Sequence, residues 1–262
     1  MMRALNTAGT GMVAQQFNLD IIANNLANVN TTGFKSQRAE FQDMVYQSLR
    51  ASGASAGGAA TTPEPVQVGL GSKFSASAAS FAAGAFQNTG NALDIAIAGD
   101  GFFQVELPDG TTAYTRDGAF KVDANGLVVS SDGYALVPNI TIPTGASQPT
   151  ISPTGQVSVT LPGQEEPSEL GTLELAVFPN PAGLTRIGQN LYRAGGASGS
   201  PSSAQPGQQG AGTLQQFVVE SSNVQIVEEM VRMITTQRAY EINSKAVQTA
   251  DDMLGILNNL KR

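Results

Sequence analysis

The side chains that most often perform catalysis are missing from this chain. It contains no His and no Cys, which are the commonest general base and the usual thiolate nucleophile. The adjacent carboxylates Glu165 and Glu166 remain, but neighbouring side chains of an extended segment point apart, whereas a glycosidase needs two carboxyl groups that face one bond. We therefore predict no catalytic residue, no metal ligand and no cofactor.

Two glycine-containing segments could suggest ligand-binding loops, and both are better explained as turns. Gly99-Asp100-Gly101 is followed by the alternating pattern Phe102-Phe103-Gln104-Val105, whereas a nucleotide-binding loop opens a helix. Asp123-Ala124-Asn125-Gly126 lacks the alternating oxygen ligands and the closing Glu of a helical calcium loop. Turns of this kind indicate a β-rich region rather than a ligand site.

Side-chain amides are concentrated between Asn24 and Lys35, where the sequence is NNLANVNTTGFK. Asn24, Asn25 and Asn28 lie among apolar positions, so several of them should contact other protein. A buried amide needs hydrogen-bond partners, and such a pair can fix one register between packed helices. The segment therefore predicts a packing interface, and Gly33 is a natural end to it.

Hydrophobic periodicity predicts a helix over residues 5–29. Eight positions recur with 3,4 spacing and seven of them are apolar, as at the a and d positions of a coiled coil. The flanking positions are mostly uncharged, unlike those of a solvated two-stranded coil, so we expect protein on most sides of this helix. The eight positions are Leu5, Ala8, Met12, Gln15, Leu19, Ile22, Leu26 and Val29.

A second helix is predicted over residues 223–260. Two apolar stripes follow one another and are offset by one residue near Gln237. Both helices are too one-sided to stand alone, so we expect a coiled-coil-like pair that also packs on neighbouring copies. The first stripe is Val224, Val227, Val231 and Ile234, and the second is Ala239, Ile242, Ala246, Thr249, Met253, Ile256 and Leu260.

The middle of the chain has the pattern of an antiparallel all-β domain. Short alternating runs between residues 93 and 192 are separated by turn pairs such as Asp109-Gly110 and Asn125-Gly126. We predict an α+β fold in three parts. Residues 1–45 and 214–262 form a terminal helical assembly domain, residues 46–92 and 193–213 an extended connector with a Gly/Ala-rich insertion, and residues 93–192 a β-rich outer domain.

The net charge of −7 comes from the middle of the chain. Residues 51–213 carry twelve acidic and five basic side chains, whereas the segments 1–50 and 214–262 are near neutral. No basic face is available for nucleic acid, and no apolar run reaches membrane-spanning length. Near-neutral ends suit dense packing, and an acidic middle suits a solvated outer surface.

Several motifs resemble those of the flagellar rod and hook axial family. NNLANVNTTGFK, which includes Thr32 to Lys35, resembles the N-terminal signature, and QRAYEINSKA at residues 237–246 resembles the C-terminal one. Within the β region, GDGFF and YTRDGAF are similar to the motifs of the family. The resemblance covers essentially the whole chain. Its positions are Thr32, Gly33, Phe34, Lys35, Arg238, Tyr240, Asn243, Gly99, Gly101, Phe102, Phe103, Arg116 and Gly118.

The resemblance implies a structural subunit that self-assembles into a rigid hollow helical tube, which transmits torque from motor to hook and encloses the export channel. The segment that continues from Tyr46–Arg50 to Val66–Lys73 favours the distal part of the rod. The implied partners are copies of the chain, proximal rod proteins below, hook protein above, the surrounding P and L rings and the flagellar type III export apparatus.

The same resemblance implies the periplasm-spanning rod of the basal body as the location, reached without a cleaved signal peptide, and termini that become ordered on assembly. Neither nucleic acid binding nor membrane insertion is expected. A proximal rod or hook subunit of the same family is an alternative, and a surface adhesin with a helical stalk is another. The enzyme alternative, a carboxylate hydrolase, requires a cleft with paired carboxylates in the β domain.

Overall fold

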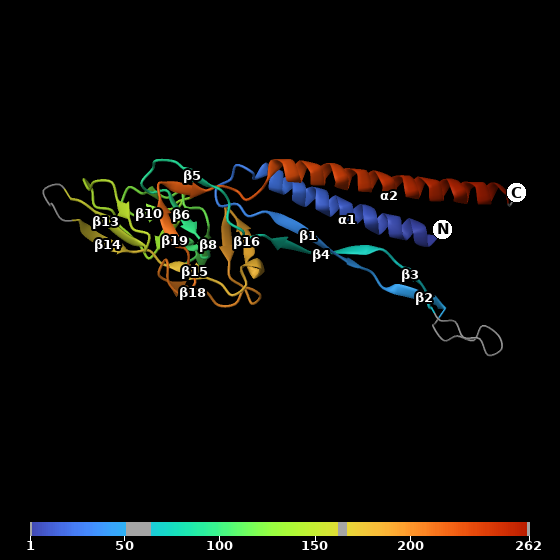
Figure 1. The fold of residues 1–262 in the computed structure, drawn as a ribbon, viewed down its shortest axis with the longest axis horizontal. Helices are drawn as coiled ribbons and strands as arrows, with labels where there is room; N and C mark the ends of the chain where they lie inside the picture. Colours follow the sequence, from blue (N-terminus) through green and yellow to red (C-terminus); the bar gives the residue numbers. More distant parts are fainter. Residues whose placement is uncertain (1, 51–63, 162–166, 261–262) are drawn as a thin grey trace. The chain divides into compact units, whose positions relative to one another are not determined.

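The computed structural model describes residues 2–50, 64–161 and 167–260 (Figure 1). They form two compact units. Unit 1 comprises Met1–Leu26, Gln37–Ala78 and Gln225–Arg262, and unit 2 comprises Ala27–Ser36 and Ala79–Val224. The chain therefore passes four times between the units, after residues 26, 36, 78 and 224.

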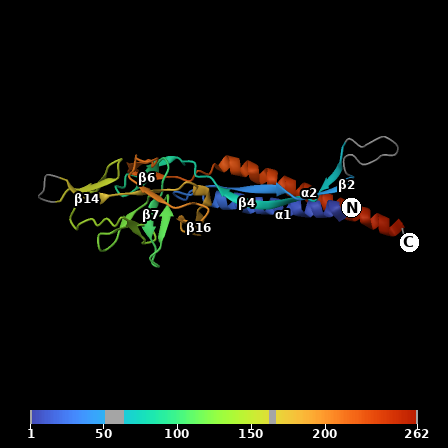
Figure 2. The same cartoon turned by 90° about the horizontal axis from the view of Figure 1, so that it is seen from below.

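Unit 1 contains both long helices, α1 (Met2–Ala27) and α2 (Ile226–Leu260), which lie side by side in Figures 1 and 2. The predicted helices are thus confirmed, and three of their four ends differ by two or three residues. The second helix begins at Ile226 rather than at residue 223, because the Asn223 side chain donates instead to the carbonyls of Ser80 and Ala82. Acidic Glu228 and Glu229 then occupy the first turn, where they favour the positive end of the helix dipole.

The rest of unit 1 is a narrow ribbon of strands. β1 (Gln37–Asp43) pairs with β4 (Ser72–Ala79), and β2 (Tyr46–Arg50) pairs antiparallel with β3 (Val66–Gly69). Of the predicted connector, residues 46–50, 66–69 and 72–79 are therefore strands of a paired ribbon.

The ribbon packs on α1 through aromatic rings and one close backbone approach. Phe17 of α1 stacks on Phe74 of β4 with 5.1 Å between ring centroids, and Phe41 meets Phe74 edge-on. Gly71 has φ +120°, and a Cβ at this position would lie 2.1 Å from the Thr10 hydroxyl oxygen. A side chain at this position would meet Thr10, so glycine permits the close approach of the ribbon to α1.

Unit 2 is an antiparallel β structure, as predicted. Its largest sheet has seven strands in the order β16-β17-β8-β7-β11-β10-β9, beside the smaller groups β12-β13-β14, β15-β18, β19-β6 and β20-β5. The strands of the large sheet are β7 (Phe103–Glu106), β8 (Thr112–Thr115), β9 (Lys121–Val122), β10 (Val128–Val129), β11 (Ala135–Val137), β16 (Thr185–Gly188) and β17 (Leu191–Arg193). The others are β5 (Phe86–Asn88), β6 (Ile95–Ala98), β12 (Thr150–Ile151), β13 (Gln156–Val159), β14 (Ser168–Thr172), β15 (Leu175–Val177), β18 (Ser202–Ala204), β19 (Thr213–Gln216) and β20 (Val218–Glu220), with a 3₁₀ turn at Pro181–Gly183.

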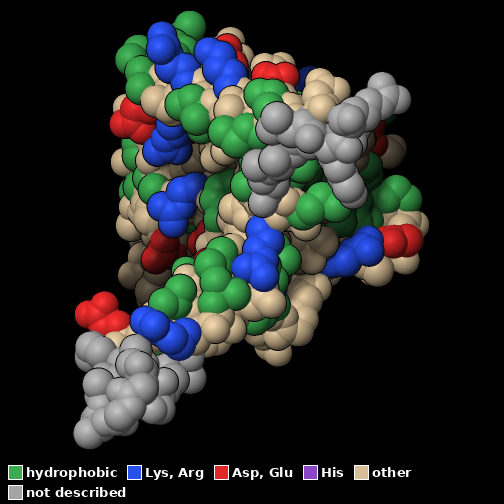
Figure 3. Space-filling view, turned by 90° about the vertical axis from the view of Figure 1, so that its right-hand side faces the viewer, with side chains coloured by type: hydrophobic (Ala, Val, Ile, Leu, Met, Phe, Trp, Pro, Cys, Tyr) green, Lys and Arg blue, Asp and Glu red, His purple; other side chains and the backbone are tan. Residues whose placement is uncertain are grey.

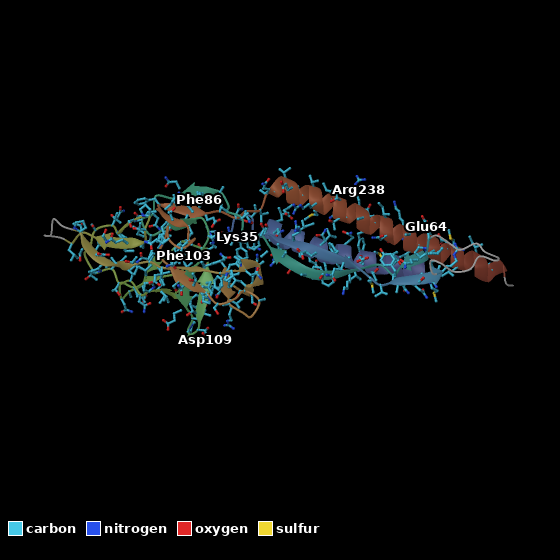
Figure 4. All side chains as sticks on the ribbon, turned by 60° about the horizontal axis from the view of Figure 1, so that its bottom comes forward. Lys35, Glu64, Phe86, Phe103, Asp109 and Arg238 are labelled. Carbon is cyan, nitrogen blue, oxygen red and sulfur yellow. The ribbon has the colours of Figure 1, made fainter. Side chains whose placement is uncertain are left out.

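Successive Phe residues supply the two cores of unit 2. Phe103 packs edge-on against Phe120 in the larger core, whereas Phe102 lies in a second core with Phe178 and Tyr192. Because neighbouring side chains of an extended segment point to opposite faces, the pair Phe102-Phe103 holds both cores together. Figure 4 shows Phe103 among the side chains inside this unit.

One low-complexity segment differs from a simple loop. Residues 195–213, which their low complexity suggests are a linker, contain β18, and this strand pairs with β15. Small side chains such as Ala204 and Ala211 are buried there, so small size rather than flexibility explains the composition. Glu165 and Glu166 lie outside the described residues. The predicted division into three functional parts stays a prediction.

Candidate assembly surfaces

Unit 2 contains a buried ionic cluster, in which Lys35 meets Glu220 at the end of β20. The Lys35 ammonium donates to Glu220 Oε1 at 2.6 Å and to the Ala82 carbonyl at 2.9 Å, and the Gly84 N–H donates to the same Glu220 oxygen at 2.8 Å. Lys35 is fully buried and Glu220 is 1% exposed. One carboxylate therefore ties together three segments that are distant in the sequence.

Two arginines complete this cluster. Arg116 Nη1 lies 3.6 Å from Glu220 Oε2, and its guanidinium packs over the Phe102 ring. Arg186 donates to the Lys35 carbonyl and lies over the Phe34 ring. Arg116 Nε, Arg116 Nη1 and Glu220 Oε2 are buried without hydrogen-bond partners in the described structure. The cluster is thus rich in cations around a single anion.

Burial dominates the ionisation of these groups. Desolvation lowers the pKa of Lys35, although the hydrogen bond and charge of Glu220 oppose this, and desolvation also lowers the pKa of Arg116. Nearby, desolvation raises the pKa of Asp117 against the hydrogen bonds that its carboxylate accepts from Ala119 and Thr32. Removing one partner of such a buried pair leaves a buried charge with less compensation, which destabilises the fold.

The turn before the cluster is fixed by glycine and by amides. Gly33 has φ +65°, and a Cβ there would lie 2.7 Å from the backbone of Arg116 and Asp117. Its N–H donates to the Glu220 carbonyl at 2.8 Å, and the Asn223 side chain accepts from the Ser36 N–H at 2.7 Å. Gly33 and Lys35, which belong to the N-terminal motif, therefore stabilise the packing of unit 2.

Between α1 and α2 the contacts are polar or small. The buried Asn25 amide donates to the Gln37 carbonyl at 2.8 Å and to Glu229 Oε2 at 3.4 Å. The Asn25 side-chain oxygen accepts from the Gln37 N–H at 2.9 Å. Asn18 donates to the Thr236 hydroxyl at 2.9 Å.

Gly11 provides a third contact of the same kind. A Cβ at Gly11 would lie 3.0 Å from the Asn243 amide nitrogen. Gly11, Asn18 and Asn25 are seven residues apart, and so are their partners Asn243, Thr236 and Glu229. The two helices thus meet in an antiparallel arrangement that repeats every heptad.

This geometry differs from the predicted seam of α1. The contacts to α2 described above come from Gly11, Asn18 and Asn25. Each of these residues directly precedes a predicted seam residue. The seam residues Leu5, Met12, Leu19 and Leu26 are only partly buried. Ile22 is buried as expected, and Val29 lies beyond the end of the helix. The hydrogen bonds and the glycine contact to α2 thus come from small and amide side chains, and the role of the apolar positions in self-assembly stays a prediction.

The predicted apolar stripes of α2 do not face α1. Val227 is 75% exposed, Ile242 is 67% exposed and Ile256 is 61% exposed. Val231, Ile234, Arg238, Tyr240 and Met253 are exposed too, whereas Asn243 is partly buried, and the Leu260 side chain lies outside the described residues. Arg238 can be followed on α2 in Figure 4. One copy of the chain therefore leaves these apolar positions in water.

The β-domain motif residues serve the packing of unit 2. Gly118 approaches the Ile95 carbonyl so closely that a Cβ would lie 1.7 Å from its oxygen, and Gly101 (φ +131°) abuts Leu175. Gly99 (φ +125°) abuts Gly212, and the strand β7 that follows confirms a turn rather than a nucleotide loop. Of the helix-end amides, Asn28 accepts from the Thr31 hydroxyl and Asn24 is exposed on α1.

A search of the described residues yields no cluster of three or more acidic side chains placed to hold a metal ion. In the same part of the chain, neither helix combines the length and apolarity that crossing a membrane requires.

Comparisons with known proteins match three segments of the chain. The family described as "Flagella basal body rod protein" matches residues 5–35, "Flagellar hook protein FlgE/F/G D1 domain" matches residues 96–159, and "Flagellar basal body rod FlgEFG protein C-terminal" matches residues 215–260. The matched segments are α1 with its following turn, part of the β unit, and α2 with the strands before it. They define the chain as an axial protein of the flagellar rod and hook.

Relatives that match over their full length narrow this class. The flagellar basal-body rod protein FlgG of Borreliella burgdorferi is 54% identical over 100% of both chains. Those of Agrobacterium fabrum and Bacillus subtilis are 47% and 42% identical, over 99% and 100% of this chain and 100% of each relative. The chain belongs to the FlgG family of flagellar basal-body rod proteins. It is a structural subunit of the flagellar distal rod and not an enzyme.

The sequence patterns do not predict contacts for Glu220, Asn18 or Thr236. Glu220 precedes the recognised C-terminal signature, and its only sequence signal is an acidic residue at the end of an apolar run. Asn18 was grouped with the flanking residues of the predicted helix, because polarity at one position does not reveal a partner on another helix.

Proposed function

We propose that the chain self-assembles through its terminal helices into a rigid hollow helical tube, which transmits torque from motor to hook and encloses the export channel. The observation that supports this is the exposed apolar face of α2, formed by Val227, Val231, Ile234, Ile242, Met253 and Ile256. Burial of one Val or Ile side chain is worth about 1.5–3 kcal/mol. Six such positions in water therefore favour a partner strongly.

The contacts within one copy support another copy of the chain as the partner. α1 and α2 meet through amides, a hydroxyl and a glycine, whereas the large apolar residues of α2 named above are exposed. We propose that they act as a coiled-coil-like pair whose register is set by these polar contacts, while copy-to-copy packing supplies the hydrophobic stabilisation. Because the hydrophobic stabilisation comes from packing between copies, the terminal helices are weakly ordered in a single copy and become ordered in the assembly.

The predicted three-part division fits such an assembly. Residues 1–45 and 214–262 would build the inner helical layer, residues 46–92 and 193–213 the connector, and residues 93–192 an outer β domain. We place the chain in the periplasm-spanning rod of the basal body, exported without a cleaved signal peptide through the flagellar type III apparatus. Proximal rod proteins lie below it, hook protein lies above it, and the P and L rings surround it.

The test of this function is a charge on the exposed apolar face of α2. In cells that depend on this chain for motility, Ile242→Asp should prevent completed rods, because an unpaired carboxylate cannot be buried between copies. Val122→Asp is the matched control, since Val122 is an exposed apolar residue of unit 2. Electron microscopy of basal bodies and swarm diameter are the measurements. Normal rods with Ile242→Asp would reject assembly through α2.

A further inference from the structure

Unit 1 has an open apolar groove on the side of α1 that carries Val13 and Phe17. The groove has a volume of about 700 Å³. Phe17 and Phe74, whose rings stack on each other, line the groove together with Met44. The remaining lining residues are Leu5, Asn6, Gly9, Thr10, Ala14, Ser72 and Lys73.

This groove is distinct from the surface that binds α2 within one copy. The contacts to α2 come from Gly11, Asn18 and Asn25, and none of these residues lines the groove. Val13 is 54% exposed and Phe17 is 46% exposed. The groove is therefore an apolar surface of α1 that the described part of the same chain leaves open.

We propose that this groove receives the second apolar stripe of α2 from another copy of the chain. The stripe, here called the ridge, consists of Ile242, Ala246, Thr249, Met253 and Ile256, and all five residues are exposed. The inference rests on the proposed function, because it supplies one defined contact for the self-assembling tube.

The dimensions of the two surfaces match. Groove residues on α1 run from Leu5 to Phe17, which is about 18 Å along a helix at 1.5 Å per residue. The ridge runs from Ile242 to Ile256, which is about 21 Å on the same basis. Side chains with 3,4 spacing form a raised row that fits a hollow beside another helix.

The charges of the two surfaces are complementary. Lys73 is the single charged residue that lines the groove, and it is exposed. On α2, the acidic Glu241 and Asp252 and the basic Lys245 lie beside the ridge, whereas Asp251 lies on the opposite side of the helix. In Figure 3, hydrophobic side chains lie next to Lys and Arg side chains on the face that is shown. An acidic, apolar ridge is thus a better occupant of the groove than a basic segment.

Different surfaces on one chain also suit an open assembly. A contact in which a groove on one copy takes a ridge from the next is heterologous, and such contacts continue into a helical filament unless the rotation closes a ring. A self-complementary patch would instead stop at a dimer. The groove and the ridge therefore provide the two unlike halves that a growing rod requires.

The absence of cysteine permits a clean cross-linking test. One variant carries Val13→Cys in the groove, and a second carries Ile242→Cys, Met253→Cys or Ile256→Cys on the ridge. When both are expressed together, a disulfide can join only different copies and needs Cβ atoms about 3.5–4.5 Å apart. Gln16→Cys replaces Val13→Cys as the matched control, since Gln16 is exposed on α1 and does not line the groove.

We expect oxidised rods to contain Val13→Cys dimers with at least one ridge position, in clear excess over the Gln16→Cys control. In addition, Lys73→Glu should reduce the number of rods, and Asp252→Lys should restore it. Completed rods without an excess of Val13→Cys dimers would overturn the groove contact and leave self-assembly standing. A wild-type chain that builds no rods in these cells would reject the proposed function itself.

Discussion

The ammonium of Lys35 lies 2.6 Å from a carboxylate oxygen of Glu220, although 185 residues separate the two in the sequence. Both side chains are buried. The segments that they join lie close in the sequence to points where the chain leaves unit 2, after residues 36 and 224. This ion pair therefore fixes the beginning and the end of the β unit to each other.

Lys35→Met should destabilise unit 2 by about 3–5 kcal/mol, because the buried Glu220 carboxylate loses its 2.6 Å ammonium partner and keeps only Arg116, at 3.6 Å, as a cation beside it. Urea unfolding followed by circular dichroism measures the change. Lys73→Met, at an exposed position, should shift stability by only about 0.5 kcal/mol. Adding Glu220→Leu to Lys35→Met should not recover the loss, because the buried Arg116 would then lose its carboxylate at 3.6 Å and the Gly84 N–H would lose its acceptor. A single variant Lys35→Met as stable as wild type would contradict the role of the pair.

Gly33→Ala should also be strongly destabilising. The backbone has φ +65° at this position, and the new methyl group would lie 2.7 Å from backbone atoms of Arg116 and Asp117. Gly9→Ala is the opposite case, since a Cβ there meets nothing within 4 Å and Ala gains about 1 kcal/mol over Gly in a helix. Thermal unfolding should separate the two variants. Equal effects would show that the tight turn is not maintained in solution.

Asn25→Ala should cost about 1–3 kcal/mol, because both the N–H and the carbonyl of Gln37 lose their partner at a buried position. Hydrogen exchange of the Gln37 amide should accelerate at the same time. Asn30→Ala changes the same residue type at an exposed position and should leave both measurements near wild type. An unchanged Gln37 exchange rate in Asn25→Ala would rule out the amide contact.

Asp117 should give the stability of unit 2 a measurable pH dependence. Burial raises the pKa of its carboxyl above the unfolded value of 3.8, so the folded state binds more protons than the unfolded state between these two pKa values. Stability should therefore fall as the pH rises through the folded pKa of Asp117. Asp117→Asn should remove this part of the slope in urea unfolding at a series of pH values. A slope that is identical in both proteins would contradict the burial effect.

The helices and the antiparallel β class were predictable because they depend on local periodicity. Seven of eight 3,4 positions in residues 5–29 are apolar, and Met2–Ala27 is a helix. The end of this helix could not be placed to the residue, because it depends on where Asn28 and Thr31 form their turn. Likewise Asn223 was assigned to α2, although its amide binds distant carbonyls in unit 2.

The pairing surface and the buried cluster were harder to predict. The apolar pattern predicts that Met12, Leu19 and Leu26 belong to the packing seam of α1, whereas Gly11 and Asn18 make the contacts to α2. A sequence pattern shows that a helix is one-sided, but not which partner satisfies an amide. The Lys35–Glu220 pair joins two segments across 185 positions, and no local pattern carries such a long-range contact.

The contact layers Gly11–Asn243, Asn18–Thr236 and Asn25–Glu229 restrict how the terminal helices can change in length. Seven added residues in each helix, at the same level, would create one more layer and leave the others opposite their partners. An insertion of four residues in α1 alone would turn the downstream amides by about 40° and shift them by about 6 Å. Natural variation in the length of this chain should therefore occur in its strands and turns, while α1 and α2 keep a constant number of residues between layers.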